Sequence, residues 1–215
     1  MKTILLITII FLGLISCKTN STKSDKTHTV WISGIKHQDI SSKKILLYPF
    51  QENLELQPKQ WKYENYTISD LEIEFGMLYK TESVINHTNK SIKVIKVLEK
   101  TQDPSSRLHD IWGLFSINQK EINTIETPIK IELNLTSNKM MGHSYCNQIN
   151  TVFFTAKNNI VFNKPFSTRM SCKSMEEENK FIATLPFANT FIIKKNQLVL
   201  FNKEGLELMV FKKLD

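Results

Sequence analysis

Residues 129–135 read Ile-Lys-Ile-Glu-Leu-Asn-Leu, a stretch in which apolar and polar side chains alternate without a break. Successive side chains of a β-strand point to opposite faces of the sheet, so this period of two predicts a strand with one buried and one open face. Half-buried strands of this kind are typical of antiparallel sheets. The stretch therefore favours a chain built mainly from antiparallel β-structure.

The rest of the C-terminal half follows the same pattern around one helix. Ser174-Met-Glu-Glu177 has the pattern of a capping box, Phe181 and Leu185 give the following residues one apolar face, and Pro186 ends the helix. Further strands are expected at 112–115, 151–155, 159–162, 191–193, 197–201 and 206–212. This half is therefore expected to be an antiparallel sheet packed on one helix, which makes the fold class α+β.

The N-terminal half predicts a small β-rich domain over residues 29–101. Its clearest signal is Leu71-Glu-Ile-Glu-Phe75, which alternates strictly and predicts a half-buried strand. Other strands are expected at 29–33, 43–50, 61–68, 77–84 and 92–98. The turn-forming residues Thr101–Ser106 separate this domain from a second one at 108–215.

The first seventeen residues have the pattern of a lipoprotein signal peptide. Lys2 precedes an apolar run from Ile4 to Ile15, which is too short to span a bilayer. The run ends in Leu14-Ile-Ser-Cys17, which resembles a bacterial lipobox, so Cys17 is expected to be the lipidated residue, with palmitate as one of its acyl groups. Residues 18–28 then form a flexible tether, and the protein is expected in the cell envelope, anchored by lipid to the outer membrane or the periplasmic face.

Composition and spacing argue against most other classes. The net charge is +7, but the lysines are scattered and only Arg107 and Arg169 are arginines, so no nucleic-acid partner is expected. The five histidines lack the spacing of a zinc site, and no glycine-rich phosphate loop occurs. Residues 105–110 contain serine, histidine and aspartate, but a linker explains them better than a triad. We therefore expect no enzyme activity, cofactor or metal.

The C-terminal half resembles the META domain, also called HslJ-like, from about Leu108 to Phe211. The resemblance rests on a Trp-x-Leu opening at Trp112, on Gly142-His-Ser-Tyr-Cys-Asn147, and on Phe162 to Cys172 with its Ser-Thr-x-Met-x-Cys ending. A Glu-rich helix and Leu-rich strands follow in the order of that family. Tyr145 and Thr151 depart from the family pattern, each standing where a Gly is common.

The N-terminal half is similar, more faintly, to an uncharacterised domain often fused ahead of META domains in bacterial lipoproteins. The matching residues are Trp61, Ile68, the run from Leu71 to Gly76, Tyr79 and residues 91–98. Neither resemblance implies an enzymatic activity. META domains are associated with stress response, secretion or protection against toxic compounds, so a stress-related role is expected.

Two cysteines remain after lipidation, Cys146 and Cys172, and both lie in the META-like half. An oxidising envelope would allow them to form a disulfide, while a metal pair lacks the usual spacing. A reactive Cys172 at a helix start is the alternative, although Glu176 to Glu178 would oppose the lowered thiol pKa that it requires.

The leading functional hypothesis is a protein that binds a hydrophobic or lipid-like molecule. The expected site is an apolar cleft between the helix and its sheet, lined by Val152, Phe154, Phe181 and Leu185. The alternative is an accessory protein whose sheet edges dock an envelope or secretion complex.

Several other residues of the META-like half have simpler expected roles. Asn147, Ser167 and Thr168 are expected to hydrogen-bond turns, with ligand contact as the alternative. The methionines Met140, Met141 and Met170 are expected to fill the core.

Overall fold

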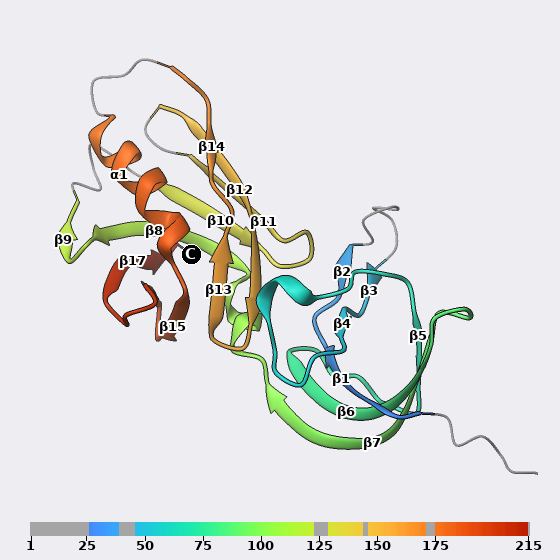
Figure 1. Ribbon diagram of the computed structural model, residues 1–215. Coiled ribbons are helices and arrows are strands. Elements are labelled where there is room, and N and C mark those ends of the chain that lie inside the picture. Colours follow the sequence, from blue (N-terminus) through green and yellow to red (C-terminus); the bar gives the residue numbers. More distant parts are fainter. Residues whose placement is uncertain (1–25, 39–45, 123–128, 144–145, 171–174, 215) are drawn as a thin grey trace, which may run out of the picture.

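The structure, a computed structural model, describes residues 26–38, 46–122, 129–143, 146–170 and 175–214. These residues form two β-sheet units and one α-helix, and the helix belongs to the C-terminal unit (Figure 1). Nearly all strand pairs in the described residues are antiparallel; the one exception there joins Thr67–Ser69 to the start of the strand at Ser91–Gln102, in the N-terminal unit. The expected α+β class with mostly antiparallel strands is confirmed.

The N-terminal unit is a five-stranded sheet with a small core on one face. Its spatial order is β4 (Phe50–Gln51), β1 (His28–Ser33), β6 (Met77–Asn86), β7 (Ser91–Gln102) and β5 (Thr67–Ser69). Two short strands, β2 (His37–Gln38) and β3 (Leu46–Leu47), pair separately, and a 3-10 turn, η1, covers Pro58–Gln60. The buried core consists of Val30, Ile32, Phe50, Tyr79, Ile92 and Val94.

The strand expected at Leu71–Phe75 does not form. The preceding residue, Asp70, has a φ of 60° and turns the chain away from β5. The Glu74 N–H then donates to the Tyr79 hydroxyl at 2.9 Å instead of to a neighbouring strand. Leu71 and Ile73 pack against the core, but Phe75 is 77% exposed. The alternation therefore reflects an irregular segment lying across the sheet.

Two other expected strands of this unit are shorter than the sequence suggests. Of residues 61–68, only Thr67 and Ile68 belong to a strand, and Lys62 forms a single antiparallel bridge with Phe50 of β4. In the expected strand at 43–50, residues 43–45 lie outside the described ranges, and Pro49 separates β3 from β4. Proline cannot donate a hydrogen bond to a neighbouring strand, so a break at this point is expected.

The C-terminal unit is an antiparallel sheet that closes on itself. Its order is β10 (Lys130–Asn134), β11 (Lys139–His143), β12 (Gln148–Ala156), β13 (Asn159–Phe162), β15 (Thr190–Lys194), β16 (Gln197–Phe201), β17 (Glu207–Lys213) and β8 (Asp110–Ile117). The ring is completed by β8, which pairs with β10. Two short strands also pair antiparallel within this sheet: β9 (Lys120–Glu121) with β8, and β14 (Phe166–Ser167) with β12.

The helix α1 (Glu176–Thr184) adds Phe181 to a core that is otherwise built mainly from strand side chains. It continues into a 3-10 turn, η3 (Leu185–Phe187). Phe181 is fully buried and meets the Phe211 ring edge-on at 6.4 Å between centroids. The N-cap residue is Met175, and Ser174 of the expected capping box lies outside the described residues. No helix within the described ranges has the length and apolar character needed to cross a membrane.

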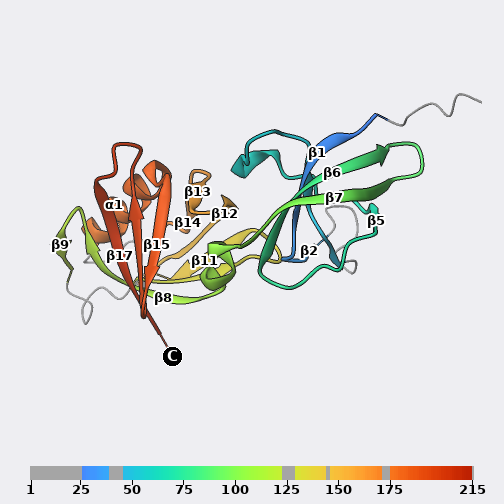
Figure 2. The ribbon, with the colours of Figure 1, turned by 90° about the horizontal axis from the view of Figure 1, so that it is seen from below.

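The two units touch through their chain junction and through direct polar contacts (Figure 2). The Trp61 indole N–H donates to the Thr155 carbonyl at 2.7 Å, and the Gln38 N–H donates to the Thr136 carbonyl at 2.8 Å. Ile35 comes from the N-terminal unit but is buried in the core of the other one.

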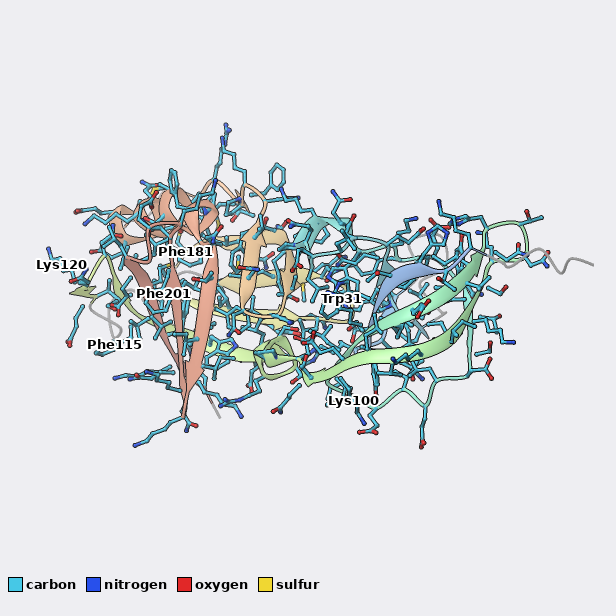
Figure 3. All side chains as sticks on the ribbon, turned by 60° about the horizontal axis from the view of Figure 1, so that its bottom comes forward. Trp31, Lys100, Phe115, Lys120, Phe181 and Phe201 are labelled. Atoms are coloured by element: carbon cyan, nitrogen blue, oxygen red, sulfur yellow. The ribbon has the colours of Figure 1, made fainter. Side chains whose placement is uncertain are left out.

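Trp31 reinforces this contact from the N-terminal sheet. The ammonium groups of Lys80 and Lys157 lie 5.2 and 5.0 Å from its ring centroid, and Figure 3 shows it where the two units approach. Lys157 belongs to the C-terminal unit, so this cation–π contact and the Lys157–Glu99 ion pair at 3.3 Å both bridge the units.

His37 makes the stability of this junction depend on pH. The residue is 7% exposed, its ring packs tilted against Tyr63 with 5.0 Å between ring centroids, and burial lowers its pKa from 6.5 to about 4. Between about pH 6.5 and pH 4, His37 is therefore protonated in the unfolded chain but largely neutral in the folded chain. The contribution of neutral His37 to the free energy of unfolding is fully present above about pH 6.5. It is expected to fall by up to about 3 kcal/mol as the pH drops to about 4.

Denaturant unfolding of the wild type and of His37→Gln between pH 7.5 and 4 tests this expectation. The variant is expected to lose most of the pH dependence, whereas His143→Gln, at an exposed histidine, is expected to keep it. An unchanged pH slope in His37→Gln would assign the acid sensitivity to another group.

Candidate functional site

A buried polar cluster joins the motif residues of the C-terminal unit to its helix. The Asn147 amide nitrogen donates to both carboxylate oxygens of Glu178, at 3.0 and 3.2 Å. The Asn147 amide oxygen accepts from the Thr168 hydroxyl at 2.8 Å and from the Met170 N–H at 2.9 Å. Ser167 also donates to Glu178, at 2.9 Å. Both Asn147 and Glu178 are almost completely buried.

These contacts assign Asn147, Ser167 and Thr168 the expected turn-bonding role. They tie the start of β12 to β14 and both to the first turn of α1. The sequence pattern does not single out Glu178, because it stands beside Glu176 and Glu177 in one acidic run at the helix start. Its position on the inner side of the helix, three residues before Phe181, was the available signal, because residues at this spacing share one helix face.

Cys146 lies beside this cluster, with its sulfur 3.7 Å from the Met170 carbonyl oxygen. Cys172 is two residues beyond Met170 but falls outside the described residues, so the Cys146–Cys172 disulfide stays a prediction. Cys17, the expected lipidation site, lies outside them too.

Thiol counting on unreduced, denatured protein tests the disulfide. We expect no free thiol from Cys146 and Cys172, and Cys146→Ser is expected to destabilise the fold by about 3 kcal/mol, since the bond closes a loop of about 26 residues. Two free thiols in freshly isolated protein would contradict the bond and favour the reactive-cysteine alternative.

The expected cleft between helix and sheet is not formed by the four residues proposed for it. Phe181 and Leu185 are completely buried in the core, where no described pocket reaches them. Val152 and Phe154 lie on the opposite face of β12 from Phe153, which is the strand's core residue. Because neighbouring side chains of a strand alternate, Val152 and Phe154 cannot face the helix that Phe153 faces.

The methionines divide in a similar way. Met140 is completely buried and fills the core as expected, but Met141 and Met170 are 47% and 56% exposed. Strand β11, which places Met140 inward and Met141 outward, is not evident from the sequence pattern. Two adjacent methionines followed by glycine carry little strand signal, since strand formers are mostly β-branched or aromatic.

An apolar groove lies instead on the outer face of the closed sheet, with a volume of about 710 Å³. It crosses β8, β10, β11, β12 and β14, and Val152 is the only proposed cleft residue among those that line it. The strand registers place five of its residues in one row across these strands: Ile111, Glu132, Met141, Asn150 and Phe166. Ile111 and Met141 are each 47% exposed and Phe166 is 72% exposed.

Charged side chains flank this row on both sides. On one side of the row, Lys130 on β10 pairs with His143 on β11, which in turn pairs with Gln148 on β12. On the other side, Lys139 on β11 pairs with Val152 on β12. Within the described residues, neither lysine has a carboxylate at ion-pair distance. Glu132 is the one acidic residue that lines the groove.

The candidate triad residues are engaged separately. Ser105 donates to Asp103 at 2.7 Å, the Leu135 N–H points to His109 Nδ1 at 3.4 Å, and Asp110 pairs with Lys213 at 3.0 Å. Among the described residues, no three histidine, cysteine or acidic side chains gather as a metal site.

Comparison with known proteins identifies a family model that matches the C-terminal half of the chain. A family model described as the META domain matches residues 106–215. No curated protein was found to match the chain. Two solved structures are similar to part of it. The crystal structure of a duf4847 family protein from Bacteroides vulgatus has 12% identity and a TM-score of 0.38, over 50% of this chain and 96% of that one. The NMR structure of a protein from Burkholderia xenovorans has 17% identity and a TM-score of 0.43, over 51% and 86%.

Proposed function

The chain belongs to the META domain family, and from that premise we propose that it is a lipid-anchored protein of the bacterial cell envelope that binds a hydrophobic, lipid-like molecule without chemically changing it. The binding site is the outer groove over β10, β11 and β12, in place of the helix–sheet cleft. The observation that carries the proposal is the row of partly exposed Ile111, Met141 and Phe166 in a groove of about 710 Å³. A volume in this range suits a small-molecule ligand.

The anchor rests on the N-terminal sequence. The apolar run from Ile4 to Ile15 and the Leu14-Ile-Ser-Cys17 ending support lipidation of Cys17. The first described strand, β1, begins at His28, so residues 18–27 are available as a spacer between lipid and fold. A lipid anchor would hold the groove near a membrane, where lipid-like molecules are abundant.

Cys17→Ser is expected to abolish fatty-acid labelling of the protein, because the thiol is the acceptor of the acyl group. Metabolic labelling of cells expressing the full chain, followed by membrane fractionation, measures both the label and the location. Cys146→Ser serves as the control and is expected to keep the label. A labelled, membrane-bound Cys17→Ser protein would contradict the anchor.

The groove is tested by native mass spectrometry of residues 18–215, a chain that retains every described strand and the helix. We expect a bound hydrophobic molecule to co-purify with the wild type, and Met141→Asp to remove it by placing a charge in the middle of the row. Leu206→Asp, at a 60% exposed residue away from the groove, is the matched control and is expected to retain the ligand. Equal occupancy in both variants would contradict the groove as the site.

A second candidate function, docking of an envelope protein, is favoured by the edge of β7. Within the described residues, β5 covers only Ser91–Lys93 of this edge, and β7 continues to Gln102. Ile95, Val97 and Leu98 are each more than 40% exposed there. Lys93 and Lys96 lie on the same strand, so an acidic, extended segment is the partner that this edge would accept as an added strand.

Site-specific photo-crosslinking in intact cells separates the two candidates. A crosslinker at Ile95 is expected to give one discrete protein adduct if the β7 edge docks a partner, while the same crosslinker at Leu206 gives none. The absence of any adduct at Ile95, together with a co-purifying lipid, would leave the groove as the functional site.

A further inference from the structure

We propose that the groove takes a single-chain amphiphile with an anionic headgroup, and that Lys130 holds the headgroup while the row through Met141 holds the chain. This inference rests on the proposed function, since it names the class of molecule that the groove binds. It is carried by the way in which strand register sorts the groove residues into an apolar row and a row of donors.

The apolar row is long enough for an extended chain. It crosses five strands from Ile111 on β8 to Phe166 on β14, which is four steps between neighbouring strands. At about 4.8 Å a step, the row measures roughly 19 Å. Its apolar side chains stand at both ends and in the middle, separated by Glu132 and Asn150. The shape fits one extended acyl chain better than a compact, rounded ligand.

The donor row lies two residues further along the same strands. Lys130, His143 and Gln148 are direct neighbours in the register of β10, β11 and β12. Two residues along a strand amount to about 7 Å, so a headgroup at this row lies beside the apolar row. An ammonium and a side-chain amide are donors, and an imidazole ring carries at least one N–H. All three side chains are exposed and can reach a ligand.

The charge balance favours an anion over other headgroups. Two lysines without ion-pair partners in the described structure face a single carboxylate, Glu132, in this groove. A cationic headgroup would be repelled by them, and a neutral one would leave both charges unused. Lys139 has Asn134 and Val152 as its register neighbours, so only one side-chain amide stands beside it. Lys130 pairs directly with His143, and Gln148 follows one strand further in the same row, so the row of Lys130 holds two further donors and is the headgroup site.

The test uses hexadecanoate and hexadecanol, two probes with the same chain and different headgroups, below their aggregation concentrations. Binding to residues 18–215 is followed through the methyl NMR signal of Met141. We expect hexadecanoate to bind at least about tenfold more tightly than hexadecanol, the difference made by one charge-assisted hydrogen bond. Lys130→Gln is expected to weaken hexadecanoate about tenfold and hexadecanol little, and the matched variant Lys139→Gln is expected to change both little.

The possible outcomes distinguish a failure of the anionic-headgroup assignment from a failure of the proposed lipid-binding function. If both probes bind equally and Lys130→Gln changes neither, the groove binds hydrophobic chains but the anionic headgroup is wrong. If Lys139→Gln weakens hexadecanoate and Lys130→Gln does not, the headgroup site is misplaced and the proposal falls. If neither probe shifts the Met141 signal, and Met141→Asp does not alter co-purification, the proposed function fails with it.

Discussion

Phe181→Ala is expected to lower the free energy of unfolding by about 4 kcal/mol. The Phe181 side chain is completely buried and meets the Phe211 ring edge-on, so its removal loses both apolar burial and an aromatic contact. The surrounding strands belong to a closed sheet and can collapse only slightly into the space. Guanidinium unfolding followed by far-ultraviolet circular dichroism measures the change.

Phe187→Ala is the matched control because Phe187 lies on the adjoining 3-10 turn but is 68% exposed. Its effect is expected to stay within about 0.5 kcal/mol, as for most surface substitutions. If the two variants were equally stable, Phe181 would not lie in the core, and a cleft between helix and sheet would become possible again.

Asn147→Ala is expected to destabilise the protein by about 3 to 4 kcal/mol. The substitution removes two hydrogen bonds to Glu178 and the acceptor for Thr168 and Met170. A buried carboxylate that loses donors pays a larger penalty than a neutral group. Asn150→Ala, at an exposed asparagine on β12, the strand that follows Asn147, is expected to cost less than about 1 kcal/mol.

A double-mutant cycle with Glu178→Ala shows whether the cost comes from this contact. The double variant is expected to be clearly less destabilised than the sum of the single variants, because with Glu178 replaced Asn147→Ala no longer removes two hydrogen bonds from a buried carboxylate. Simple additivity would mean that Asn147 and Glu178 contribute to stability independently. It would contradict the idea that their hydrogen bonds hold the start of β12 against α1.

The repeated strand pattern of the C-terminal half was readable from sequence because burial there follows backbone geometry. Ile129, Ile131, Leu133 and Leu135 are all buried and the residues between them are more exposed, as their alternation predicts. The strands at Asn159–Phe162 and Gln197–Phe201 lie where the sequence places them. In each case one face of a regular strand meets the core.

Alternation was misleading where the segment did not pair. Leu71 and Ile73 contact the N-terminal core while their backbone lies outside the sheet. A period of two reports which side chains are buried, and it does not report whether another strand is available for hydrogen bonding. The positive φ of Asp70, which redirects the chain, is a single local conformation that the residue pattern did not reveal.

The candidate site divides in the same way. The sequence identified Asn147, Ser167 and Thr168 as polar residues that organise turns. In the structure Asn147 and Ser167 both donate to the Glu178 carboxylate, and Thr168 donates to Asn147. It could not say that Glu178 is that carboxylate, because the partners are 31 and 11 residues away from it along the chain. The expected ligand residues failed for a related reason: Val152 and Phe154 share a strand with Phe153, and only one face of that strand can meet α1.

By itself, the sequence determined the class of the fold, the positions of most strands in the C-terminal half, the single helix and the likeness to META domains. These properties depend on local periodicity and on motifs that are contiguous in the chain. The tertiary structure decided that the large sheet closes through β8 and β10, that Phe181 fills its interior, and that Ile111, Met141 and Phe166 form one row. Register between strands far apart in sequence is set by the packing of the whole sheet, so the surface that it assembles could not be read from any one segment.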